Sequence, residues 1–265
     1  MIGVTAWCLL ATQQQDWPRW LKLIHSSGYE GIELHIESSP WPITPGIKVE
    51  QLSWLLKAIE NANLTITGLS TMLHINTPIT SADPETQGKA LEIVYNMIDL
   101  ASAVGGKHIS IAPGGRDACW QDALPVITQL NTVAKNKGVR LLLENVWYSF
   151  SRDMEQLWNL VCAVDDSNTG ICLDIGNALP YGDIDAWIGK FSGHIGKVHI
   201  SDVVCGCPNV TCPVGEGKVD WAVIAQELER IHFSSDCTLE LFPKHGRSMP
   251  RELIRSRQFI KKYFV

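Results

Sequence analysis

Four side chains of the kinds that bind metal ions or move protons stand at the ends of short apolar stretches. Each follows residues that are almost entirely apolar, where a charge is costly unless it is paired or bound to a metal. Three of them are carboxylates and one is an imidazole. This hard, oxygen-rich donor set suits Mn²⁺, Mg²⁺ or Co²⁺, with Zn²⁺ as an alternative, and predicts a site for one divalent metal ion. The residues are Glu144, Asp174, His199 and Glu240.

The stretch 170–202 indicates how such residues can converge. It contains an apolar run ending at Asp174, a helix-like segment over 183–191, and a second apolar run that carries His199. A strand, helix and strand of this length return as a right-handed parallel crossover. Parallel strands present their carboxyl ends at one edge of a sheet, so Asp174 and His199 are predicted to lie at that edge together.

Apolar runs alternate with amphipathic segments along the whole chain. Runs such as LLLENV and ICLDIG are apolar without alternation, as strands covered on both faces are. Eight such alternations over about 250 residues predict a single (β/α)8 TIM barrel, one domain over 1–265, with its site at the carboxyl ends of the strands. An open doubly wound sheet is the alternative, but Trp7-Cys8-Leu9 follows the first strand where that fold usually has a glycine-rich turn. The expected strands are 2–7, 29–36, 64–69, 107–112, 139–146, 171–175, 197–200 and 237–242, and the expected helices are 17–26, 49–61, 84–104, 124–137, 154–164, 183–191, 221–232 and 250–264.

Composition excludes several classes of protein. The chain has 265 residues, a formal net charge of -6 and 45% hydrophobic residues. The negative charge argues against a nucleic-acid partner, because phosphate neutralisation needs a concentrated basic face. No run is long enough to span a membrane, and the N-terminus lacks the regions of a signal peptide. We therefore expect a cytoplasmic protein with a small-molecule partner, and homo-oligomerisation stays open.

The 8 cysteines are expected to be reduced thiols in that compartment. Four of them lie in apolar stretches and are expected in the core: Cys8, Cys162, Cys172 and Cys237. Three others cluster in one loop: Cys205, Cys207 and Cys212. Their spacing fits no standard zinc finger, so a structural metal and a packed loop both remain open there.

Five motifs occur in order along the chain: LLLEN, CLDIGN, KVHISD, PVGEGKVDW and TLELF. Together they resemble the xylose isomerase-like superfamily of sugar-phosphate isomerases and epimerases, which also contains endonuclease IV. The resemblance covers nearly the whole chain, including HINTPITSADPETQGKALEI. In the epimerase branch Glu, Asp, His and Glu hold a divalent cation, and these fall on the four residues named above. Many relatives have Asp-x-x-His where this chain has Asp174-Ile-Gly-Asn177, a form similar to L-ribulose 5-phosphate 3-epimerases.

The resemblance implies an isomerase or epimerase for a sugar or sugar phosphate. A ketose would bind the ion through its carbonyl and neighbouring hydroxyl, and a carboxylate would remove the α-proton to form an enediolate. Glu144 and Glu240 are the implied catalytic carboxylates, acting on opposite faces of the carbon. A metal-dependent dehydratase of the inosose or dehydroshikimate type and a non-catalytic small-molecule-binding barrel are the alternatives. Endonuclease IV is improbable, because its histidines after strands three and four are replaced by Ser70-Thr71 and by Ala112.

Residues near the strand ends are candidates for substrate contact, although each could instead serve only in loop packing: Asn177, His74, Trp7, Trp147 and Lys218. Trp41 and Trp120 are expected at the same end of the barrel. On the second strand Glu33 and His35 alternate with apolar residues, and we expect one to face the mouth and the other to pack outward. Glycines and cations in the loops after strands four, seven and eight could bind a phosphate. They are Gly114, Gly115, Arg116, Gly215, Gly217, Lys218, Lys244, His245 and Arg247.

Overall fold

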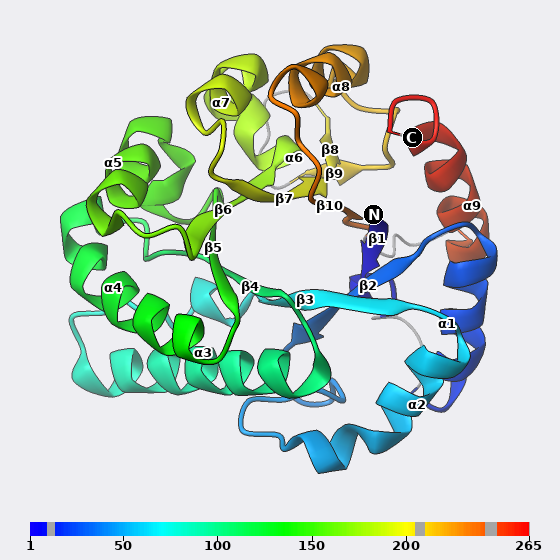
Figure 1. Ribbon diagram of the computed structural model, residues 1–265, viewed down its shortest axis with the longest axis horizontal. Helices are drawn as coiled ribbons and strands as arrows, with labels where there is room; N and C mark the ends of the chain where they lie inside the picture. Colours follow the sequence, from blue (N-terminus) through cyan, green and yellow to red (C-terminus); the bar gives the residue numbers. More distant parts are fainter. Residues whose placement is uncertain (10–13, 205–209, 242–247, 265) are drawn as a thin grey trace.

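The computed structural model describes residues 1–9, 14–204, 210–241 and 248–264. Within these residues eight strands close into a barrel in the order β1-β10-β7-β6-β5-β4-β3-β2, and every neighbouring pair is parallel (Figure 1). The predicted (β/α)8 barrel is confirmed. Its strands are β1 Ile2–Thr5, β2 Gly31–Ile36, β3 Thr65–Thr71, β4 His108–Ile111, β5 Arg140–Glu144, β6 Thr169–Asp174, β7 Ile195–Ile200 and β10 Asp236–Leu239.

Helices surround the barrel, and at least one follows each of its strands (Figure 1). They are α1 Trp17–Ser26, α2 Ser53–Asn61, α3 Pro84–Val104, α4 Trp120–Asn136, α5 Met154–Val164, α6 Ile175–Ala178, α7 Ile184–Lys190, α8 Trp221–Arg230 and α9 Met249–Ile260. In the described part of the chain, six short 3-10 helices accompany them: Ala6–Leu9, Gln14–Asp16, Val49–Leu52, Leu73–Ile75, Phe150–Arg152 and Leu179–Tyr181. Among the described helices, none has the length and apolar character needed to cross a membrane.

Local signals explain where the helices begin and end. The side chain of Asp83 accepts a hydrogen bond from the backbone N–H of Thr86 at 3.0 Å, and Pro84 occupies the first position of α3. That helix ends at Gly105, whose φ of 76° is readily adopted only by glycine. Asp220 caps α8 in the same manner, through the N–H groups of Ala222 and Val223. The expected bounds of the helices at these three termini are therefore confirmed.

Several boundaries differ from the expected ones, and three of these differences change where a helix begins or where a site residue lies. Helix α4 begins at Trp120 instead of residue 124, because Asp122 accepts a hydrogen bond from the backbone N–H of Cys119 at 2.9 Å and caps an earlier turn. Strand β1 ends at Thr5, so that Trp7 lies in a 3-10 helix. Strand β10 ends at Leu239, which places Glu240 just beyond the strand rather than within it.

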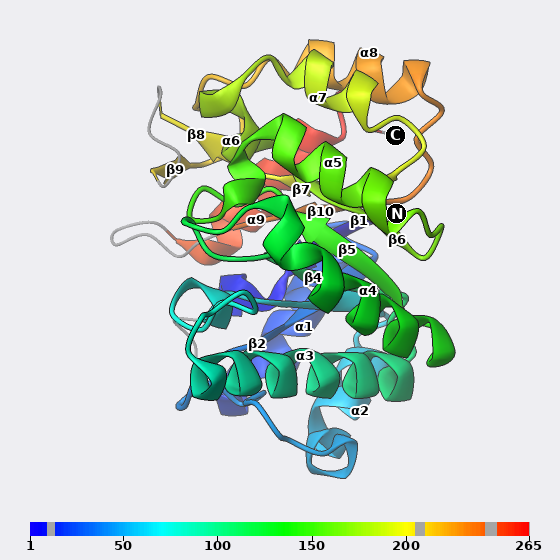
Figure 2. The same ribbon diagram turned by 90° about the vertical axis from the view of Figure 1, so that its left-hand side faces the viewer.

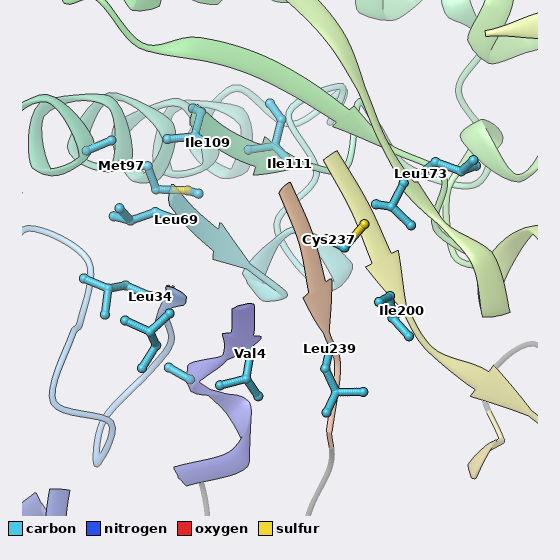
Figure 3. Close-up of a cluster of buried hydrophobic side chains, with 14 of the residues drawn as sticks. Val4, Leu34, Leu69, Met97, Ile109, Ile111, Leu173, Ile200, Cys237 and Leu239 are labelled. Carbon is cyan, nitrogen blue, oxygen red and sulfur yellow. The ribbon is translucent and has the colours of Figure 1, made fainter. Parts of the chain in front are cut away.

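Apolar side chains fill the layer between the strands and the helices (Figure 3). Leu69 and Ile109 are neighbours in register on β3 and β4, and both belong to one buried cluster with Met97 of α3. Cys8, Cys172 and Cys237 are buried as predicted, whereas Cys162 is exposed. Helix α5 buries Leu160 and Val161, and the next position along the helix turns to solvent. An apolar stretch alone therefore did not establish which face of this helix is buried.

Many of the barrel residues that alternate with this apolar layer are polar. On β2 Glu33 and His35 are both buried and lie two residues apart, which places them on the same face of the strand. The expectation that one faces the mouth and the other packs outward was therefore wrong. The other buried polar residues of the barrel strands are Thr5, Thr67, Ser70, Thr71, His108, Ser110, Thr169, Asp174, Lys197, His199, Asp236 and Thr238.

A small antiparallel pair of strands, β8 Asp202–Val203 and β9 Thr211–Cys212, was not expected from the sequence. Figure 2 shows it beside α6, at the opposite end of the barrel from the N-terminus. Cys212 lies in this pair, while Cys205 and Cys207 lie outside the described residues, so the suggested metal in that loop stays a prediction. Strand β8 of this pair begins two residues after the end of β7, the strand that carries His199.

The carboxylate of Asp202 links two of the sequence motifs. It accepts hydrogen bonds from the backbone N–H groups of Gly215, Gly217 and Val219 at 2.9, 3.2 and 3.3 Å, and from the indole N–H of Trp221. A Cβ atom at Gly217 would collide with Asp202 Oδ1, so only glycine fits there. The two motifs KVHISD and PVGEGKVDW are therefore linked in the structure. The buried carboxylate of Asp202, which ends the first motif, fixes the loop that the second motif forms.

Asp202→Ala is expected to lower the free energy of unfolding by about 3 kcal/mol, because several buried N–H donors lose their acceptor together. Asp220→Ala is the matched control, since it removes an exposed helix cap worth about 1 kcal/mol. Urea denaturation of both variants measures the difference. Equal losses would show that the Asp202 contacts add nothing beyond a single cap.

Candidate metal centre

The four ligand-type residues converge at the carboxyl ends of four adjacent strands. Glu144 ends β5, Asp174 ends β6, His199 lies on β7, and Glu240 follows β10, which is the barrel order. One ligand atom from each lies within 4.8 Å of those of the other three. Asp174 and His199 are also direct partners in the β6–β7 register. The structure thus brings together the four residues that were predicted to meet at the strand ends.

The electrostatics of this group fit a cation. Burial, reinforced by the neighbouring Glu144 charge, raises the pKa of Asp174 to about 6. Burial and the charges of Asp174 and Glu144 likewise hold the pKa of Glu240 well above its ordinary value. Carboxylates this close disfavour each other's ionised forms, and a divalent ion among them removes that penalty. Three carboxylate oxygens and one imidazole nitrogen at these separations fit the ion that the sequence predicted.

Asp174 is held in place by its neighbours. Its Oδ1 accepts hydrogen bonds from the Ser201 hydroxyl at 2.6 Å and from the backbone N–H of Asn177 at 2.7 Å. The Asn145 side chain bonds both the backbone N–H and the carbonyl of Asp174. Since the hydrogen bonds from described residues use Oδ1, Oδ2 is the oxygen that remains for a cation. Gly176 allows this approach, because its N–H donates to the Ser201 hydroxyl and a Cβ there would strike that oxygen.

The imidazole of His199 faces acids on both sides. Its Nδ1 lies 3.4 Å from Glu144 Oε1 and 3.4 Å from Glu240 Oε1, while its Nε2 lies 2.9 Å from Glu33 Oε2. Burial alone would lower the pKa of His199, but the surrounding carboxylates reverse this effect and hold it well above the ordinary value. Cys172 lies beside the group, but burial raises the pKa of its thiol to about 11, so it stays protonated and is a poor ligand.

A cavity of about 220 Å³ opens above these residues. Three of the predicted substrate contacts line it, namely Asn177, Trp7 and Trp147. The Trp7 ring packs on His35 with ring centroids 3.9 Å apart, so a flat apolar surface and a polar ring form one wall. Other described lining residues are Ser70, Thr71, Met72, Val146, Tyr148, Ser201, Val203 and Thr211. An enclosure of this size, part apolar and part polar, suits one small ligand.

Two other predicted substrate contacts lie elsewhere. His74 is buried in the 3-10 helix after β3, and it does not line this cavity. Burial lowers its pKa to about 4, as expected of a neutral packed histidine. Lys218 lines a separate hollow with Trp221 and Phe259. Their assignment to substrate therefore has no geometric support.

The other tryptophans and the phosphate candidates are distributed differently. Trp41 donates its indole N–H to the carbonyl of His35, and Trp120 begins α4; neither lines the cavity. Arg116 lies over the Trp147 ring, 6.0 Å from its centroid, in an adjoining hollow that shares Trp147 and Tyr148 with the cavity. Gly115 lines that hollow, whereas Gly215 and Gly217 line the one that contains Lys218. Lys244, His245 and Arg247 lie outside the described residues.

Sequence reasoning missed Tyr148 and Ser201. Tyr148 follows β5 by four residues and lines the cavity. Burial, together with the charges of Glu144 and Glu240, raises the pKa of its hydroxyl, so this group remains a donor. The signal was available, since both residues lie in the loops that follow strands with candidate ligands.

Glu240→Gln is expected to stabilise the metal-free protein, increasingly so as the pH rises above about 4.3, the ordinary pKa of a glutamate carboxyl. Because the pKa of Glu240 is raised, the folded wild-type protein binds a proton more tightly than its unfolded chain, and its stability falls as pH rises above the unfolded value. Glutamine carries no such linkage. Denaturation in EDTA at several pH values measures this, with the exposed Glu155→Gln as control. A pH-independent difference would contradict the expectation.

Comparison with known proteins agrees with the barrel fold. The family model of the xylose isomerase-like TIM barrel matches residues 21–263, and the chain belongs to that family. It is 22% identical over 262 residues to the L-ribulose-5-phosphate 3-epimerase of Salmonella paratyphi A, covering 92% of this chain and 89% of the relative. A solved L-ribulose 3-epimerase superposes with a TM-score of 0.81 at 20% identity, over 98% of this chain and 93% of the other. A structure of the IolI protein with a bound zinc atom superposes with a TM-score of 0.78 at 19% identity, over 99% of both chains.

Proposed function

We propose that this protein is a divalent-metal-dependent isomerase or epimerase of a sugar or sugar phosphate, acting through an enediolate. The observation that carries the proposal is the position of Glu144 and Glu240, whose oxygens each lie 3.4 Å from the same nitrogen of His199. In the barrel, β6 and β7 separate the strands that bear these two carboxylates. The two carboxylates therefore reach the same nitrogen of His199 from opposite sides, Glu144 from the end of β5 and Glu240 from the end of β10.

Two acids placed in this way can act on the two faces of one carbon. Glu144 would remove the proton next to a ketose carbonyl from one face, and Glu240 would return a proton to the opposite face, which inverts the centre. Their side chains are only 13% and 14% exposed, so bulk water has little access to the proton being moved. The largely buried carboxyl of Glu240 binds a proton more readily than an ordinary carboxyl, as a group that must also act as an acid requires.

Glu144, Asp174, His199 and Glu240 would hold the ion, with Mn²⁺, Mg²⁺ or Co²⁺ the best fit to the donor set and Zn²⁺ an alternative. When bound, such an ion draws charge from a carbonyl oxygen and so acidifies the neighbouring C–H group. The protein supplies the remaining requirements. The side chain of Asn177 is placed at the cavity to orient a substrate hydroxyl, and the faces of Trp7 and Trp147 provide apolar surface for a sugar ring or chain.

The names of the relatives support this substrate class. The Salmonella relative is named for a ketose phosphate, and the solved L-ribulose 3-epimerase for a free ketose. A phosphorylated substrate would place its phosphate towards the hollow that contains Arg116, which adjoins the cavity at Trp147. We therefore propose a ketose or ketose phosphate with its carbonyl beside the acidic group, without specifying which of the two.

Proton NMR in D₂O tests the proposal. Metal-free protein and protein loaded with Mg²⁺ or Co²⁺ are incubated with ketoses, ketose phosphates and inosose-type cyclic ketones. We expect loss of one α-proton signal, only with metal present, together with the signals of an epimer or isomer. A new alkene signal would instead identify a dehydratase. Absence of exchange with every compound, despite bound metal, would contradict an isomerase for these substrates and favour a binding protein.

A further inference from the structure

The imidazole of His199 has a partner on the side facing away from the cavity. Its Nε2 lies 2.9 Å from Glu33 Oε2, a hydrogen-bond distance, while Nδ1 points to the group formed with Glu144 and Glu240. A histidine ligand that binds through one nitrogen is commonly oriented by an acceptor at the other. Glu33 occupies that place here.

The contact crosses the interior of the barrel. Glu33 lies on β2 and His199 on β7, and the barrel order places β1 and β10 between these strands. The Glu33 side chain is 0% exposed and that of His199 is 1% exposed. A carboxylate buried so completely costs several kcal/mol unless charged or hydrogen-bonding partners compensate.

Lys197 provides the compensating charge. Its Nζ lies 2.5 Å from Glu33 Oε1, and its side chain is also 0% exposed. Each oxygen of Glu33 thus has its own partner, Oε1 the ammonium group of Lys197 and Oε2 the imidazole of His199. Lys197 and His199 lie two residues apart on β7, so their side chains point to the same face of the strand. Both therefore reach the same carboxylate.

Fold stability gives no reason for this arrangement. Replacing a buried ion pair by apolar residues of similar volume is often neutral or stabilising. The apolar layer between strands and helices already supplies a core (Figure 3), and neither Glu33 nor Lys197 belongs to that buried cluster. Its geometric consequence is instead the orientation of one imidazole.

We propose that Glu33, neutralised by Lys197, is a positioning residue that accepts the Nε2–H of His199 and so presents the Nδ1 lone pair to the metal. This inference rests on the proposed metal-dependent function. Without Glu33, the ring could rotate or carry its proton on Nδ1, and either change removes the fourth ligand. Loss of such an oriented partner typically lowers metal affinity by about 10- to 100-fold.

Two double variants isolate the acceptor from the charge. Glu33→Gln/Lys197→Met removes both charges but retains an amide oxygen near Nε2, whereas Glu33→Leu/Lys197→Met removes the acceptor as well. Mn²⁺ affinity is measured by electron paramagnetic resonance in competition with a chelator, and unfolding is measured on the metal-free proteins. We expect Glu33→Leu/Lys197→Met to lose about 10- to 100-fold in Mn²⁺ affinity, and Glu33→Gln/Lys197→Met to lose much less, at similar metal-free stability.

A second readout needs no variant. In the Mg²⁺-loaded wild-type protein, ¹⁵N NMR of the His199 ring should show the proton on Nε2; a proton on Nδ1 would overturn the proposal. Equal Mn²⁺ affinity in the wild type and both variants would overturn it too, as would equal losses in both variants. Should the wild-type protein bind neither Mn²⁺ nor any of the other proposed ions, the proposed function fails and this inference with it. Metal binding that is indifferent to Glu33 refutes the inference alone.

Discussion

Glu144→Gln and Glu240→Gln are each expected to lower the rate of epimerisation by about 10³, as the loss of a positioned acid or base typically does. Both carboxylates lie within reach of a single point beside His199, and glutamine keeps their shape while removing the ability to take a proton. Rates are measured by NMR with the substrate that the D₂O panel identifies.

The residual activity should differ between the two variants in a mirror-image manner. If the two acids serve opposite faces, Glu240→Gln retains slow solvent exchange with only one epimer, and Glu144→Gln retains it with only the other. Because both residues are also proposed ligands, metal content at saturating Mn²⁺ is measured alongside. The exposed Glu155→Gln serves as control, since that side chain is 63% exposed and pairs with Lys190 on the surface. Epimerisation within about tenfold of wild type in either variant would contradict the role of that residue.

Much of the fold could be predicted because parallel strands leave a strong signal. Strands β5 and β6 are buried on both faces, so their sequences are continuous apolar runs, and glycine or a capping acid marks the adjoining helices. Termini that depend on local hydrogen bonds were less accessible. The early start of α4 follows from the Cys119–Asp122 cap, and cysteine is not a residue from which a helix start is usually inferred.

The candidate metal ligands were predictable for a geometric reason, whereas the residue that supports His199 was not. Asp174 and His199 end or nearly end adjacent strands, so barrel closure alone brings them together. Glu33 lies 2.9 Å from His199, closer than the 3.4 Å of Glu144 and Glu240. However, it belongs to β2 and reaches His199 through the barrel interior. Period-two alternation shows that a residue lies on one face, but it does not show which face or what lies opposite. Which residue lies opposite Glu33 is determined by the closure of the barrel, and no local sequence pattern specifies that closure.

Loop positions explain the remaining differences. His74 and Lys218 both follow strands, as site residues of barrels do, but the loops turn them away from the cavity. Conversely, Tyr148 enters the cavity directly beside Trp147. A strand end determines where a loop starts, and the path of the loop beyond it depends on hydrogen bonds such as those of Asp202.

Removal of divalent metal with a chelator is expected to abolish epimerisation while the barrel remains folded. The apolar core between strands and helices does not involve the acidic group, so circular dichroism should be unchanged. The free energy of unfolding should still fall. The group contains three carboxylates, and removing the metal also removes the positive charge that compensates for their mutual repulsion. A ligand present at about 100 times its dissociation constant stabilises a folded protein by about 2.7 kcal/mol, and this sets the size of the expected loss.

Adding back single metals distinguishes a cofactor from a general effect of ions. Mn²⁺, Mg²⁺ or Co²⁺ should restore both activity and stability, as the oxygen-rich donor set requires, with Zn²⁺ as the comparison. The Asp174→Asn variant is the matched control, because it keeps the shape of the side chain but removes one anionic ligand, and it should regain little of either. Full activity in protein shown by elemental analysis to be free of metal would refute metal dependence. The two facing acids would then have to lower the barrier to proton removal with only the donors of the cavity, among them the hydroxyl of Tyr148, to stabilise the developing negative charge.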